Sequence, residues 1–200
     1  MFIQVFKGKV GDEAAARRTL ERWRDEVMPG ATGFLGSTTG VAADGTLVGL
    51  ARFESRDAAM ANSGRPEQDA WWSEMEKCFE DEVKFGECDD VTVVLGGGSD
   101  EARFVQVMTG HSDDIARMHQ VMSSHQDEMH AARPEILGGV MMDVGNRRYV
   151  QAFYFTSEEA ARAGEKLDLP DDVRAEIEEG MALMGEATFI DLPNPLFISP

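Results

Sequence analysis

Residues 2–8, FIQVFKG, decide the fold of this chain because they recur 102 positions later as FVQVMTG at residues 104–110. The same shift, without a gap, lays FESRDAA at residues 53–59 over FTSEEAA at residues 155–161. A single register that persists across so much of each half is not expected by chance. We therefore interpret the 200 residues as two copies of one module, joined in tandem.

Each copy has the pattern strand, helix, strand, strand, helix, strand. In the first copy Pro29 ends the first helix, and Ala43–Gly45 separates two apolar runs in the manner of a short hairpin turn. A βαββαβ unit forms a four-stranded antiparallel sheet with both helices on one face, which leaves the other face apolar and uncovered. We predict an α+β protein with modules at residues 1–95 and 104–200, a polar glycine-rich linker at 96–103, and each module covering the open sheet face of the other.

Four stretches of the first copy resemble the dimeric α+β barrel superfamily, which includes the antibiotic-biosynthesis monooxygenases. They are PG at residues 29–30, GFLG at 33–36, RFESRDAA at 52–59 and the tryptophan pair at 71–72. The resemblance implies two tandem ferredoxin-like modules that form an intrachain dimeric α+β barrel. It also implies that a small hydrophobic molecule binds between the helices and the sheet of one module.

The superfamily contains cofactor-independent oxygenases, haem-degrading enzymes and haem-binding proteins, so the resemblance leaves several activities open. The haem-degrading members carry a haem-ligating histidine in their second helix. This chain departs from that pattern, because its first histidine is His111 in the second copy. We therefore expect no cofactor, with haem kept as the alternative.

Charge and cysteine content narrow the choice of partners and compartment. The chain has 37 acidic and 19 basic side chains, and its net charge of −18 would repel nucleic acid and anionic membrane surfaces. Cys78 and Cys88 form no metal-binding spacing, which fits a reduced, cytoplasmic environment. The first residues are too polar for a signal peptide. We expect a cytoplasmic protein with no nucleic-acid or membrane partner, and we leave a homodimer open.

His125 is the candidate catalytic residue because it falls on the apolar stripe of the first helix in the second copy. A titratable ring facing the sheet could act as a general base. We expect the substrate contacts in the same module to be Gln106, Gln151, Tyr154 and Met122. The alternative for His125 is a core histidine that hydrogen-bonds to a carbonyl group or water. No two histidines are spaced four residues apart, so we expect no metal site.

Two functions remain open on these grounds. The first is a monooxygenase-like enzyme that oxidises a hydrophobic or aromatic molecule without metal or flavin, with amide and phenol groups stabilising an enolate. The second is a ligand-binding or haem-binding protein without catalysis. Gln106 has a counterpart at Gln4 in the first copy, and this repetition also fits a purely structural role for both amides.

Overall fold

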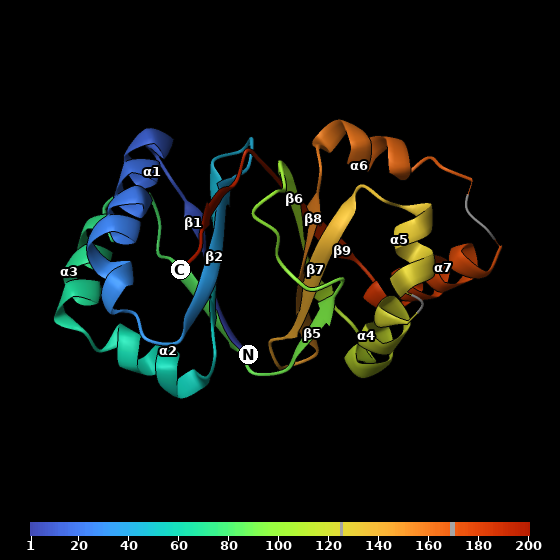
Figure 1. The fold of residues 1–200 in the computed structure, drawn as a ribbon, viewed down its shortest axis with the longest axis horizontal. Coiled ribbons are helices and arrows are strands. Elements are labelled where there is room, and N and C mark those ends of the chain that lie inside the picture. Colours follow the sequence, from blue (N-terminus) through green and yellow to red (C-terminus); the bar gives the residue numbers. More distant parts are fainter. Residues whose placement is uncertain (125, 169–170) are drawn as a thin grey trace. The chain divides into compact units, whose positions relative to one another are not determined.

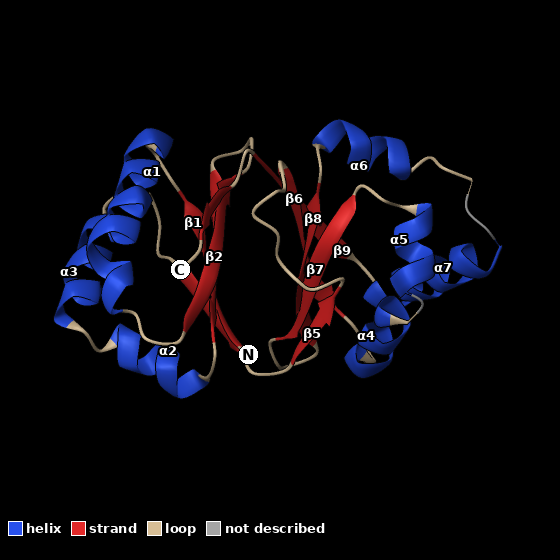
Figure 2. Ribbon diagram, in the orientation of Figure 1, coloured by secondary structure: helices blue, strands red, loops and turns tan. Residues whose placement is uncertain are grey.

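The computed structural model describes residues 1–124, 126–168 and 171–200, and it shows two α+β modules, each built on a five-stranded antiparallel sheet. The first module comprises residues 1–89 together with 195–200, and the second comprises residues 90–194. In each module the helices lie on one face of the sheet (Figures 1 and 2). This confirms the predicted α+β class and the tandem ferredoxin-like units.

The first module has the sheet order β10-β2-β3-β1-β4. Its first helix, α1, continues into a π-helical turn and then a 3-10 turn. The elements are β1 (Phe2–Lys9), α1 (Glu13–Arg22), η1 (Trp23–Val27), η2 (Met28–Gly30), β2 (Phe34–Val41), β3 (Thr46–Phe53), α2 (Arg56–Ser63), α3 (Pro66–Glu76), β4 (Lys84–Cys88) and β10 (Leu196–Ile198).

The second module repeats this plan with the sheet order β5-β7-β8-β6-β9. Its elements are β5 (Val91–Val94), β6 (Phe104–His111), α4 (Ile115–Ser123), α5 (Gln126–Ala132), β7 (Ile136–Asp143), β8 (Arg148–Phe155), α6 (Glu158–Gly164), α7 (Asp171–Met184) and β9 (Ala187–Pro193). Both copies carry a register shift at the start of the second strand of the repeat, between Phe34 and Gly36 and between Ile136 and Gly138.

One of the two edge strands of each sheet comes from a segment that we had placed in the other module. Val91–Val94, which the sequence placed in the first module, pairs with β7 in the second. Leu196–Ile198, at the end of the second copy, pairs with β2 in the first module, where it is the red strand in Figure 1. The division at residues 95 and 104 therefore differs from the structural one. Sequence periodicity shows that a segment is extended, but not which sheet edge accepts its hydrogen bonds.

A serine side chain caps the second helix of each copy. Ser55 and Ser157 accept hydrogen bonds from Ala58 N at 3.1 Å and from Ala160 N at 3.0 Å. These bonds satisfy backbone donors that a helix start leaves without partners. The repeated caps orient corresponding helices in the same way against their sheets.

The helix-facing side of each sheet carries the core of its module. In the first module Phe2 and Phe53 lie there with the helix residue Trp71, and in the second Phe104 and Phe155 occupy the corresponding positions. Residues at intervening strand positions point to the other face, which is also apolar. The helix side of each sheet also carries polar side chains among its apolar ones, such as Gln4 in the first module and Gln106 in the second.

We expect the C-terminal strand to be required for the stability of the first module. Ile198 is 2% exposed in the helix-side core, so Ile198→Ala should lower the free energy of unfolding by about 2–5 kcal/mol, the range for such truncations in a core. Urea denaturation followed by tryptophan fluorescence would measure it, because all three tryptophans belong to this module. Val93→Ala, on the partly exposed β5 strand, is the control, and equal effects of the two variants would contradict the expectation.

Candidate functional site

A cavity of about 270 Å³ lies between the sheet and the helices of the first module. At least one lining residue comes from every strand of that sheet, and the opposite wall comes from α1, η1, α2 and α3. Its floor positions, such as Gln4 on β1 and Ala51 on β3, point toward the helices. The location between helices and sheet is the one that the resemblance implied.

Aromatic rings form a large part of the cavity wall. Trp23 packs edge-on against Phe34, with ring centroids 4.8 Å apart, and lies 6.3 Å from the ring of Trp71. Trp71 Nε1 donates a hydrogen bond of 2.7 Å to the carbonyl oxygen of Thr19, which holds its ring against the first helix. The seven aromatic lining residues are Phe6, Trp23, Phe34, Phe53, Trp71, Trp72 and Phe85. Such a wall favours a flat, apolar ligand.

A hydrogen-bonded amide network fixes the polar part of the wall. Trp23 Nε1 donates to Gln68 Oε1 at 2.7 Å, and Asn62 Nδ2 donates to the same oxygen at 3.2 Å. Arg65 Nη1 in turn donates to Asn62 Oδ1 and to the carbonyl oxygen of Val27, each at 3.0 Å. An indole nitrogen can only donate, so the oxygen of Gln68 must face Trp23. The orientation of the Gln68 amide is therefore set by its neighbours.

This orientation leaves the Nε2 group of Gln68 as a donor at the cavity. Among the described residues, none accepts a hydrogen bond from it. The other uncharged polar lining residues are Gln4, Ser37, Thr39, Asn62 and Ser63, and the one ionisable lining residue is Asp69, which is exposed. The described lining contains no lysine, arginine or histidine. The cavity thus suits an uncharged ligand with an oxygen acceptor, and it offers no cation for a carboxylate or phosphate.

Trp23 occupies a special place in the backbone. It is the first residue of the π-helical turn Trp23–Val27 that interrupts the first helix. π-Turns within helices widen the backbone locally and are frequent at functional sites. Because Trp23 both lines the cavity and binds the Gln68 oxygen, the turn positions the group that orients the amide.

The second module brings together some of the residues that the sequence selected. Gln151 is fully buried on the helix-facing side, where its Nε2 lies 3.4 Å from Met122 Sδ and 3.7 Å from Met118 Sδ. Gln106 lies on the same side and donates a hydrogen bond of 2.9 Å to Asp191. His125 lies outside the described residues. Gln151 and Met122 are therefore in contact with each other, whereas Gln106 binds a carboxylate of its own module.

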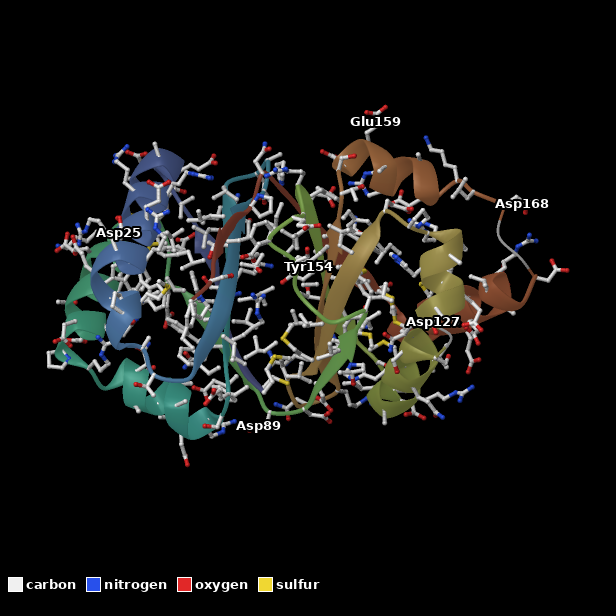
Figure 3. The ribbon with its side chains drawn as sticks, viewed as in Figure 1. Asp25, Asp89, Asp127, Tyr154, Glu159 and Asp168 are labelled. Carbon is white, nitrogen blue, oxygen red and sulfur yellow. The ribbon has the colours of Figure 1, made fainter. Side chains whose placement is uncertain are left out.

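Tyr154 does not share this location, which corrects the prediction that it lines a pocket with Gln151. The two residues are three positions apart on β8, and strand side chains alternate between faces. Gln151 faces the helices, so Tyr154 faces the opposite side of the sheet (Figure 3). The acidic residues Asp25 and Asp127, by contrast, point outward from their helices in the same view.

Similar folds occur among solved structures, with low sequence identity. A "putative monooxygenase" from Lactobacillus acidophilus NCFM has a TM-score of 0.77 at 13% identity, over 99% of this chain and 95% of the other. An anthrone oxidase-like protein has a TM-score of 0.70 at 12% identity, over 99% and 92%. A ferredoxin-fold protein of Listeria monocytogenes, related to antibiotic biosynthesis monooxygenases, has a TM-score of 0.50 at 11% identity, over 100% and 95%.

No protein-family model matches the sequence, and no curated protein matches it significantly. The structural matches cover both copies, which is the observation that decides the fold. The chain has the tandem ferredoxin-like, monooxygenase-like fold of these structures. At these identities the likeness establishes the fold alone, and the activity has to be argued from the site.

Within this monooxygenase-like fold, one strand position on the floor of the first-module cavity differs between the two copies. Ala51 of β3 pairs with Ser37, and the equivalent residue of β8, Phe153, pairs with Gly139. The ring of Phe153 lies over Gly139, where a β-carbon would come within 2.8 Å of it. Phe153 therefore occupies the space that the small Ala51 leaves open. The difference between Ala51 and Phe153 is visible in the aligned sequences of the two copies. We nevertheless predicted the site in the second copy, because His125 lies there.

The second module of this monooxygenase-like fold contains a buried histidine, His119. Its Nδ1 lies 3.2 Å from Thr92 Oγ1, and among the described residues its Nε2 has no hydrogen-bond partner. Burial lowers the pKa of the His119 imidazole, while the nearby carboxylates Asp90 and Asp143 oppose this shift. In the described chain no three His, Cys, Asp or Glu side chains gather as a metal site. No described helix has the length and apolar character needed to cross a membrane.

We expect Ala51→Phe to fill the cavity. The new ring would point between sheet and helices as Phe153 does in the second copy, so binding of the uncharged dye N-phenyl-1-naphthylamine should fall at least tenfold. Dye fluorescence would measure this, with far-UV circular dichroism to confirm folding. Ala61→Phe places the same ring at an exposed site of α2 and is the control. Dye binding that survives Ala51→Phe would contradict the assignment.

We also expect His119 to make stability depend on pH. Its pKa is lowered in the folded state, so as the pH falls below about 6.5 the unfolded chain takes up the proton first. The free energy of unfolding should then decrease by at most about 1.4 kcal/mol per pH unit until the folded-state pKa is reached. Urea denaturation between pH 7.5 and 5 should show a weaker dependence for His119→Gln. The exposed His111→Gln is the control, and an unchanged slope for His119→Gln would contradict the prediction.

Proposed function

We propose that the first-module cavity binds a small, flat aromatic molecule bearing a ketone or phenol oxygen, and that the protein is a monooxygenase-like enzyme acting on it. The observation that carries this proposal is the fixed Gln68 amide. Its oxygen is held by Trp23 and Asn62, which leaves its N–H group for an acceptor in an otherwise aromatic cavity. A pre-oriented donor in an apolar surrounding is suited to an oxygen that gains negative charge during a reaction.

The corresponding chemistry is oxidation of an activated CH2 group conjugated to an aromatic ketone. Loss of one proton places negative charge on the ketone oxygen, where a donor from Gln68 would stabilise it. The resulting electron-rich carbon reacts with O2, one oxygen atom becomes a new carbonyl group and the other leaves as water with both CH2 hydrogens. This balance requires no further reductant. A structural neighbour named as anthrone oxidase-like supports this reaction class.

The proton acceptor is the least constrained part of the proposal. In the first module Asp69 is the ionisable group at the cavity, and we propose that it or solvent accepts the proton. His125 as a base in the second module, with Gln106, Gln151 and Met122 as substrate contacts, stays a separate prediction. Replacing His125 by Phe tests it, because turnover that is unaltered would reject that histidine as the base.

Haem does not fit the cavity of the first module. Its described lining contains no histidine, cysteine, tyrosine or methionine that could supply an axial ligand. Non-catalytic binding of the same aromatic molecule is the second candidate, and it is favoured by the absence of a buried general base among the described lining residues. The two candidates share the binding site and differ in whether O2 is consumed.

The substitution Gln68→Glu separates the donor role of Gln68 from its structural role. A glutamate keeps an oxygen acceptor for Trp23 and Asn62 but removes the N–H group and adds a negative charge facing the ligand oxygen. With anthrone as the substrate, O2 consumption should fall about 100-fold or more. Anaerobic binding, followed by tryptophan fluorescence, should also weaken.

The control is Gln120→Glu, on the exposed surface of α4 in the second module. It should leave both measurements unchanged. Tight anthrone binding without O2 consumption by the wild-type protein would favour the non-catalytic candidate. An unaltered rate in Gln68→Glu would reject the proposed role of the amide.

A further inference from the structure

We propose that Phe85 sets the length of the ligand that the first-module cavity accepts, an inference that rests on the proposed function. The cavity crosses the sheet from one edge to the other. At the β10 edge it is closed by Ile198, which is 2% exposed, whereas at the β4 edge its lining residue is Phe85, which is 64% exposed. The two ends of the cavity are therefore different, one closed by the core and one open to solvent.

The distance between these ends matches an elongated molecule. Five adjacent strands span four inter-strand spacings, or roughly 19 Å between the edge strands. A single ring held at Gln68 would leave the β4 end unfilled. A ligand with further fused rings would extend along this direction to Phe85, because Gln68 and Trp72 lie four residues apart on one face of α3 and Trp72 packs against Phe85.

The position of Phe85 is supported from the inside by other rings. Its ring centroid is 5.1 Å from that of Trp72, and the ring of Trp72 lies 5.6 Å from that of Phe6, edge to face. Phe6 in turn lies over Gly49, which has no side chain to displace it. One side of Phe85 is thus held against a continuous aromatic stack while most of its surface remains open.

When another aromatic ring covers an exposed phenylalanine that is held in place in this way, the contact stabilises the complex. A ligand ring that reaches it would bury apolar surface of both partners. A ligand that ends earlier would leave Phe85 in water and gain nothing from it. Phe85 therefore selects ligands by their length, while Gln68 selects those that carry an oxygen acceptor.

The second copy contains a matched residue for the test. Phe189 on β9 pairs with Met108 as Phe85 on β4 pairs with Phe6, and it is 50% exposed. Arg174 stands in the second copy where Trp72 stands in the first, so the supporting stack is missing there. Phe189→Ala removes the same side chain from an equivalent strand position but not from the cavity.

The experiment measures anaerobic binding of acetophenone, 1-tetralone and anthrone, which carry one ketone and one, two and three rings. Tryptophan fluorescence reports binding to the full-length protein. In the wild type, affinity should rise from acetophenone to anthrone. Phe85→Ala should weaken anthrone binding about tenfold and leave acetophenone within twofold, while Phe189→Ala should match the wild type for all three. Phe85→Tyr, which keeps the ring, should restore anthrone binding.

The outcomes separate this inference from the proposed function. If Phe85→Ala binds anthrone as tightly as the wild type does, or loses affinity for all three ketones equally, the role of Phe85 in selecting length is overturned while the binding site stands. If the wild-type protein binds none of the three, both the proposed function and the role of Phe85 are overturned. Because Phe85 is largely exposed, Phe85→Ala should retain its circular dichroism spectrum, and a folded variant is required for either conclusion.

Discussion

Side chains alternate between the two faces of a β-strand, and this period of two residues governs which groups in the protein can meet. It places Gln4 and Ala51 under the helices of the first module, where the cavity lies. It places Gln151 toward the helices and Tyr154 away from them, although the two are near neighbours in sequence. The candidate site is therefore a property of one face of one sheet.

Duplication of a module supplies two equivalent positions, and side-chain volume makes their interiors differ. Interiors are packed so closely that one large ring can fill the volume of a small ligand. Phe153 does so in the second module, while Ala51 leaves the corresponding space in the first. The two copies thus share a backbone plan but differ in interior shape. A tandem chain can change one site in this way without altering the other.

The polarity of the cavity wall follows from which hydrogen-bond donors and acceptors pair with one another. An amide has a donor end and an acceptor end, and Trp23 can only donate. Two donors at the oxygen of Gln68 fix the orientation of its amide, so the polarity of this part of the wall depends on Trp23 and Asn62. Aromatic rings from two helical segments and four strands line the cavity around this group. Apolar surroundings of this kind strengthen a hydrogen bond.

The sequence alone determined the duplication, the βαββαβ order and the α+β class, because these depend on local periodicity and on residues close together in the chain. It also indicated a binding site between helices and sheet through its resemblance to known modules. Only the tertiary structure decided that β5 and β10 join sheets distant in sequence, that a cavity forms in the first module, and that Gln68 lines it with its oxygen held by Trp23 and Asn62. Those features depend on strand pairing, on side-chain volume and on hydrogen bonds between residues far apart in sequence, and no local pattern records them.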